Sequence, residues 1–154
     1  MPERMTQDLD AIISLDDANE AREKLLKARF KFETELTIGG STWKSPKKQY
    51  IDLLESDAEW MSDAIKEAQK NRDLQGLPIL PFRFLVLLKF KAGRTQDFAD
   101  ITRMLGQANA TLIRQTKKTF QEWEPHGLKD LEHLIYLGKL EMKCFTGPRS
   151  TIQK

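Results

Sequence analysis

Three aspartates have the spacing and setting of a cluster that could hold divalent cations. Asp8 and Asp10 are two residues apart in a short stretch typical of a β-strand, and alternate strand residues point to the same face. Asp52 lies inside a second apolar pattern, Tyr-Ile-Asp-Leu-Leu, where an acid needs a partner or a metal. Neighbouring carboxylates repel, and Mg²⁺ relieves the repulsion because it prefers oxygen ligands. If the two strands are neighbours, the acids converge as a two-metal centre requires.

Each piece of this pattern also has a structural explanation. An Asp-X-Asp pair at the start of a strand commonly caps or orders the backbone there, and a single acid in an apolar strand can find a hydrogen-bond partner. The combination of Asp8, Asp10 and Asp52 is more specific than any one of them.

The elements that would position the acids alternate between strand and helix in the first half of the chain. Alternating or apolar stretches indicate strands, and Gly39-Gly40-Ser41 indicates a hairpin turn. The stretch from Phe32 to Ile38 alternates, so we expect a half-buried strand there. The predicted strands are 8–14, 32–38 and 50–54, the predicted helices are 16–30 and 58–70, and a basic loop spans 44–48.

The second half of the chain reads as helix only. Pro81 suits the start of an apolar, buried helix that Gly93 ends, and Gly106 is expected to end the next one. The predicted helices are 82–92, 95–105, 109–123 and 128–140. We therefore expect an α+β domain: an α/β core in residues 1–80 with a small mixed sheet, a helical part of the same domain in 81–145, and a loose tail in 146–154.

Three segments together resemble the minimal nucleotidyltransferases, which include abortive-infection-type toxins. Residues 4–10, Arg-Met-Thr-Gln-Asp-Leu-Asp, are similar to their segment with paired acids, and residues 50–54 are similar to their third-acid strand. Residues 88–100, Leu-Lys-Phe-Lys-Ala-Gly-Arg-Thr-Gln-Asp-Phe-Ala-Asp, are similar to their helical Lys-X-X-Ala-X-Arg-X-X-Asp-X-X-Asp segment. The resemblance covers residues 4–106 and implies a polymerase-β-like sheet followed by helices.

The resemblance implies transfer of a nucleoside monophosphate from a nucleoside triphosphate, with loss of pyrophosphate. Asp8, Asp10 and Asp52 would be the catalytic residues and the ligands of Mg²⁺ or Mn²⁺. Asp8 and Asp10 would hold the metals and the nucleotide phosphates, while Asp52 would ligate the second metal and help activate the incoming hydroxyl. A protein, a tRNA and a small molecule all remain open as the acceptor.

Arg4, Thr6 and Lys89 are the candidates for nucleotide contacts. Lys89 has an equally good structural role, as the ion-pair partner of Asp97 or Asp100. Arg94 and Asp97 have the spacing of a helix-start ion pair. Lys44, Lys47 and Lys48 in the basic loop could contact RNA or a nucleotide, although a solvated loop is the preferred interpretation. The tryptophans are expected to be core or rim residues.

One departure from the family separates two hypotheses. The family has a Gly-Ser or Gly-Gly motif upstream of the paired acids, whereas seven residues precede Asp8 here. We expect either that the true start lies upstream or that the form is shortened. The alternative to an enzyme is a catalytically incomplete interaction module, such as one member of a toxin–antitoxin or defence pair. A truncated sheet would expose an edge, so we expect a homodimer or a protein partner that covers it.

Composition limits the remaining choices. The formal net charge is +2, which neither requires nor excludes nucleic acid as a partner. The single cysteine, Cys144, cannot form an internal disulfide, and two histidines exclude a histidine-rich metal site. The longest apolar run, residues 84–88, is too short to span a bilayer, and the first residues do not resemble a signal peptide. We therefore expect a cytoplasmic protein without a membrane partner.

Overall fold

The computed structural model describes the backbone of residues 8–146 and the side chains of residues 9–144. The chain folds as two compact units, Met1–Lys66 and Glu67–Lys154. The class is mixed α+β, as the sequence predicted: a four-stranded sheet in the first unit and a set of helices in the second. None of the helices in residues 8–146 has both the length and the apolar character needed to cross a bilayer.

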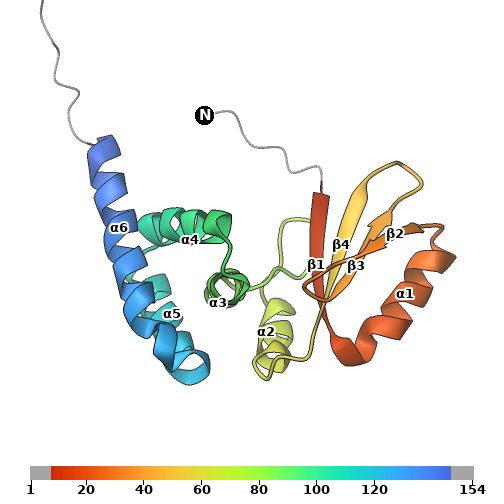
Figure 1. The fold of residues 1–154 in the computed structure, drawn as a ribbon, viewed down its shortest axis with the longest axis horizontal. Helices are drawn as coiled ribbons and strands as arrows, with labels where there is room; N and C mark the ends of the chain where they lie inside the picture. The colour runs from red at the N-terminus through yellow and green to blue at the C-terminus, as the bar shows by residue number, and fades with distance from the viewer. Residues whose placement is uncertain (1–7, 147–154) are drawn as a thin grey trace, which may run out of the picture. The chain divides into compact units, whose positions relative to one another are not determined.

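The first unit contains one sheet with one parallel and two antiparallel pairings (Figure 1). Its elements are β1 (Asp8–Ser14), a 3-10 turn (Leu15–Asp17), α1 (Ala18–Lys27), β2 (Lys31–Glu35), β3 (Gly40–Lys44) and β4 (Tyr50–Ser56). The strand order is β1-β4-β3-β2, with β1 parallel to β4. The chain therefore leaves β1 through α1, enters the far edge at β2, and returns through an antiparallel meander to pair β4 with β1.

Helix α1 covers one face of this sheet. Arg22 of α1 donates to Glu55 of β4 at 2.8 Å and to Glu35 of β2 at 2.9 Å. The register places Trp43 and Leu53 on the same face as these two acids, and both apolar side chains are buried. The core of the unit therefore lies between α1 and the sheet, and the opposite face carries Asp10 and Asp52.

The β2–β3 hairpin differs from the strand expected over 32–38. Strand β2 ends at Glu35, all its residues are exposed, and Phe32 and Ile38 are 48% and 61% exposed, so the half-buried strand was wrong. β2 is an edge strand without a covering element over most of its length. The expected turn is present, but Gly40 already belongs to β3, a strand that the glycines concealed. Gly40 has φ +118°, and a Cβ there would lie 2.0 Å from the Leu53 carbonyl oxygen.

Helix α2 (Met61–Ala68) is shorter than the helix expected over 58–70, and the division between the two units falls within it. The Ser56 hydroxyl accepts a hydrogen bond from the Ala58 amide at 3.3 Å, which orders the chain after β4. A turn follows before the helix begins at Met61. Within the second unit, Glu67 forms an ion pair with Arg83.

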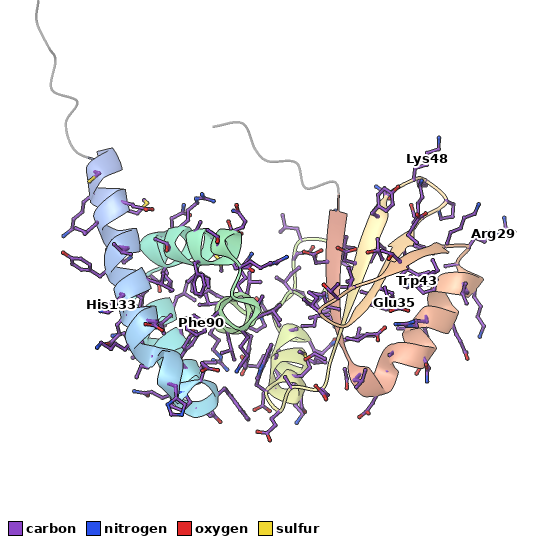
Figure 2. All side chains as sticks on the ribbon, in the orientation of Figure 1. Arg29, Glu35, Trp43, Lys48, Phe90 and His133 are labelled. Atoms are coloured by element: carbon purple, nitrogen blue, oxygen red, sulfur yellow. The ribbon has the colours of Figure 1, made fainter. Side chains whose placement is uncertain are left out.

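The second unit is a set of helices around an apolar core. Its elements are α3 (Phe82–Ala92), α4 (Thr95–Gln107), α5 (Ala110–Trp123), a 3-10 turn (Pro125–Gly127) and α6 (Leu128–Thr146). The bounds of α3 agree with the prediction, and Gly93 ends it in the left-handed conformation, φ +67°. Phe90 contacts Phe98 and Phe120 edge to face at centroid distances of 5.8 and 5.1 Å (Figure 2).

Gly106 does not end its helix, contrary to the expectation, because it serves helix packing instead. It lies inside α4 against Gly138 of α6, and a Cβ on Gly106 would lie 2.5 Å from the Gly138 carbonyl oxygen. The end of α4 is satisfied from α6, where the Lys139 ammonium donates to the carbonyl oxygens of Gly106 at 2.9 Å and Ala108 at 2.6 Å. Two adjacent residues of α6 therefore set the α4–α6 crossing.

Replacing Gly138 with alanine should destabilise the protein by about 1–3 kcal/mol, since overpacking forces backbone shifts. The added Cβ would lie 2.2 Å from the Thr102 carbonyl oxygen, too close for any rotamer change to relieve. Urea unfolding followed by circular dichroism measures the difference. Glu141→Ala, on an exposed position of the same helix, is the control and should stay within about 0.5 kcal/mol of the natural chain. Equal stability of the two variants would contradict the close contact.

Candidate functional site

The parallel register places Asp10 directly beside Asp52. The two are partners in the β1–β4 pair, and partners in a parallel pair present their side chains on the same face. Neighbouring strands are about 4.8 Å apart, so the two carboxylates are adjacent. Asp8 lies two residues earlier in β1, where its backbone pairs with Tyr50. The Asp8 side chain lies outside the described residues, as do Arg4 and Thr6 entirely.

Asp52 is oriented by a hydroxyl from the next strand. Thr42 of β3 is the register partner of Asp52 and donates from Oγ1 to Oδ1 of the carboxylate at 2.6 Å. A hydrogen bond to an ionised acceptor is short and strong. Asp52 is half-buried and Asp10 is exposed. The row across the sheet is thus Asp10, Asp52 and Thr42, with one oxygen of Asp52 engaged and the face still open to solvent.

The adjacent row on the same face is basic and aromatic. Tyr50 of β4 pairs with Lys44 of β3, which in turn pairs with Lys31 of β2. The Lys44 ammonium lies 5.2 Å from the centre of the Tyr50 ring, a cation–π distance. Its hydrogen bond with the Tyr50 side chain raises the pKa of Lys44 above the usual value. Lys44 therefore stays protonated at every physiological pH, in the row next to the acids.

The donors in this region suit a hard divalent cation. Among the described side chains, no group of three or more histidines, cysteines or acids is arranged to hold a metal. Asp10 and Asp52 supply two carboxylates from adjacent strands, and the backbone of Asp8 lies on the row beside them. Oxygen ligands of this kind fit Mg²⁺ or Mn²⁺ and do not fit a soft metal. Asp8, Asp10 and Asp52 are therefore the residues that would hold such an ion.

A separate cavity of about 480 Å³ opens at the other end of the same strands. Its lining includes Ser14 and Ser56, the last residues of β1 and β4, and none of the three predicted acids. Crevices at the carboxyl ends of parallel strands commonly bind ligands. The charged residues that line this one are four acids and one base: Asp16, Asp17, Asp57, Glu59 and Lys66. The cavity offers one base for a phosphate, whereas the sheet face has Lys31 and Lys44 in the row beside its acids, so the sheet face is the better candidate for a triphosphate.

In the second unit, Lys89 is occupied by acids of its own unit. Its ammonium lies 3.0 Å from Asp100 and 3.5 Å from Asp97, the structural role that the sequence left open. Arg94 contacts Asp97 at 2.6 Å, and the Asp97 carboxylate accepts a hydrogen bond from the Arg94 amide, which makes it a helix cap. Hydrogen bonds from Arg94 lower the pKa of Asp97, and the hydrogen bond from Lys89 lowers the pKa of Asp100.

Thr42 and Tyr50 were not anticipated as site residues, and Lys44 was expected in a basic loop instead of a strand. They were missed because residues 40–44 were not recognised as a strand. In the structure these residues alternate between the buried Ser41 and Trp43 and the half-buried Thr42 and Lys44. The Trp43 indole donates to the Ser41 hydroxyl at 2.8 Å within the core. Once 40–44 is read as a strand in a hairpin with 50–54, Thr42 falls opposite Asp52 by counting alone.

Comparison with known proteins identifies no relative: the chain matches no protein-family model, and no curated protein matches it.

Asp97→Asn should lower the free energy of unfolding at neutral pH by about 2 kcal/mol, as expected for a lost charged hydrogen bond. Because the folded-state pKa of Asp97 is lowered, its stabilisation is complete above the unfolded pKa of about 3.9 and is lost as the pH falls through the folded value. Urea unfolding from about pH 7 to pH 2 should therefore show the two chains converging in acid. Glu122→Gln, on an exposed position of α5, is the control. A gap that stays constant down to pH 2 would contradict the assignment.

Proposed function

We propose that this chain is a cytoplasmic nucleotidyltransferase-fold protein that transfers a nucleoside monophosphate from a nucleoside triphosphate to an acceptor hydroxyl. The observation that carries the proposal is the pairing of Asp10 with Asp52 on one open face of the sheet, with Asp8 two residues away on β1. This is the placement that a two-metal centre needs, and it supports the resemblance of the three sequence segments to the minimal nucleotidyltransferases.

In this proposal Asp8, Asp10 and Asp52 hold Mg²⁺ or Mn²⁺. When bound, the metal neutralises phosphate charge and activates the attacking oxygen. Asp52 would ligate the second metal and help activate the acceptor hydroxyl, because the Thr42 hydroxyl engages Oδ1 and leaves the second carboxylate oxygen for the metal. Thr42 acts as a positioning residue, since its hydrogen bond fixes the rotation of the carboxylate. Phosphoryl transfer depends mainly on such positioning and charge neutralisation.

The three candidates for nucleotide contacts are supported unequally. Arg4 and Thr6 rest on the sequence resemblance. Lys89 is held by Asp97 and Asp100, which favours a structural role in the helical unit over a phosphate contact. The acceptor is a protein, a nucleic acid or a small molecule.

A second candidate function is a non-catalytic interaction module, and one feature of α6 favours it. The helix buries Leu131 and Gly138 on one side. On the other side Tyr136, Leu137 and Leu140 are 64%, 49% and 39% exposed, and His133 continues the same stripe (Figure 2). These positions follow the spacing of one helical face. Exposed apolar stripes of this kind mark contact surfaces.

The occupant that fits the α6 stripe best is a second copy of the chain. Asp130 and Lys143 lie about two helical turns on either side of the middle of the stripe. Two antiparallel copies of α6 would therefore bring Asp130 of each copy beside Lys143 of the other. This charge complementarity gives a closed two-fold dimer, the commonest form of self-association.

Incubation with an α-³²P-labelled nucleoside triphosphate and Mn²⁺ should transfer label to the protein itself or to added RNA. Asp10→Asn and Asp52→Asn should each reduce transfer by at least about 100-fold, since both remove a ligand of the reacting centre. Mn²⁺ alone should raise the melting temperature of the natural chain and of neither variant, because a ligand that binds the folded state stabilises it.

Asp57→Asn, in the cavity at the far ends of β1 and β4, is the matched control for this experiment. It should keep both the transfer and the response to Mn²⁺. Loss of both properties in Asp57→Asn with retention in Asp52→Asn would place the site in the cavity. A natural chain with neither property would refute the proposed enzyme.

Light scattering after size exclusion at micromolar concentration should give twice the monomer mass of 17.8 kDa if α6 mediates a dimer. Leu137→Glu/Leu140→Glu should restore the monomer, since four charges would face each other in the dimer. Gln115→Glu/Lys118→Glu, on the exposed side of α5, should leave the dimer intact. A natural chain that elutes at 17.8 kDa at every concentration would rule out this second candidate.

A further inference from the structure

Two neighbouring rows on the open sheet face carry charges of opposite sign. In one row Asp10 and Asp52 are register partners, and in the next Lys44 and Lys31 are register partners. The register places both pairs on the same face. Like charges directly opposite each other on adjacent strands destabilise a sheet. The basic row therefore costs stability unless an anion lies on it.

The nearest members of the two rows do not neutralise each other. Asp52 takes its hydrogen bond from Thr42, and Lys44 lies with Tyr50, so no Lys44–Asp52 ion pair forms among the described residues. The acid that acts on Lys44 at a distance is Glu33. The charge of Lys44 is therefore not paired by Asp52, its neighbour in the acidic row.

The basic row is also continuous with further cations. Lys47 and Lys48 lie in the loop that joins β3 to β4, directly beyond Lys44, and both are exposed (Figure 2 labels Lys48). Within the part of the chain that the structure describes, none of these three lysines has a carboxylate within ion-pair distance, and neither has Lys31.

Some basic residues elsewhere in the described chain are paired with acids. Arg22, Arg94 and Lys117 each have an acidic partner within 4.0 Å. The four lysines instead lie close together without such partners, and the Lys31–Lys44 pair lies in the row beside the acids. The cluster is therefore a candidate site for an anion.

We propose that Lys31 and Lys44 form a phosphate-binding subsite next to the acids, with Tyr50 as a positioning residue that holds Lys44. A phosphate group on the basic row would relieve the repulsion between the two lysines, and a cation on the acidic row would lie beside it. A ligand that carries both, a metal-bound polyphosphate or the phosphate backbone of an oligonucleotide, matches the whole face. The subsite rests on the proposed function, because it takes the phosphates of a substrate that reacts at the acids.

The subsite can be tested by binding, without any catalytic readout. Two probes are used on the full chain with Mn²⁺: inorganic tripolyphosphate by calorimetry, and a fluorescein-labelled single-stranded octauridylate by anisotropy. Lys31→Gln/Lys44→Gln should weaken one or both probes by at least about 10-fold, since each lysine supplies a charged hydrogen bond. For the RNA, the slope of log affinity against log salt should decrease by about 1–2.

Two further variants separate the subsite from general charge and from misfolding. Lys24→Gln/Lys27→Gln removes the same charge from α1 and should leave both affinities within about twofold of the natural chain. Tyr50→Leu removes the ring over which the Lys44 ammonium lies at 5.2 Å, and it should weaken binding by about 3-fold with an unchanged melting temperature. Equal loss from the α1 and sheet doubles would overturn the subsite.

The two probes also distinguish the source of the phosphate, and they test the subsite separately from the proposed transferase activity. Loss confined to tripolyphosphate indicates a nucleotide's own phosphate chain, and loss confined to octauridylate indicates a polynucleotide. Unchanged binding of both probes to Lys31→Gln/Lys44→Gln refutes the subsite even if the chain transfers nucleotides. Reduced binding in a chain that transfers nothing supports the subsite and refutes the proposed enzyme.

Discussion

The parallel pairing of β1 with β4 determines the rest of the first unit. Parallel strands cannot be joined by a tight turn, so the chain must place other elements between them. Here those elements are α1 and the β2–β3 hairpin. The helix covers one face, and the hairpin extends the sheet beyond β4. Because the pairing is in register at Asp10 and Asp52, the same constraint that orders the topology also brings two acids together on the face opposite α1.

The sheet face opposite α1 carries a charge arrangement that lowers the stability of the sheet. A β-strand gains from apolar partners across the sheet, and the covered face has them in Trp43 and Leu53. The face opposite α1 instead pairs Asp10 with Asp52 and Lys31 with Lys44. Arg22, on the covered side, shows what the chain does when charge is structural, since it contacts Glu35 and Glu55 at once. The two faces of one sheet therefore use charge for different purposes.

Much of the fold could be predicted from local patterns, and the failures have physical causes. Strands β1 and β4 and helix α3 follow directly from apolar runs with clear ends, such as Gly93. Strand β3 was not predicted because its first residues resemble a turn. The burial of Trp43 depends on its pairing with Phe32 and Ile51 on the neighbouring strands, which the local pattern does not show. Gly106 was read as a helix end although its role is to admit Gly138, which no local pattern reveals. At the site, the acids were visible in the sequence, whereas the basic row exists only through the register.

The register gives this fold an uneven tolerance to changes in chain length. Side chains alternate along a strand, so one extra residue between Asp10 and Ser14 would turn part of β1 over and separate the acids onto opposite faces. The loop from Ser45 to Gln49 lies outside the paired residues and can lengthen without changing any partner. Natural variants of this chain should therefore differ in length at the hairpin loops and keep the spacing within β1 and β4. The segments without insertions would then mark the strands that carry the site.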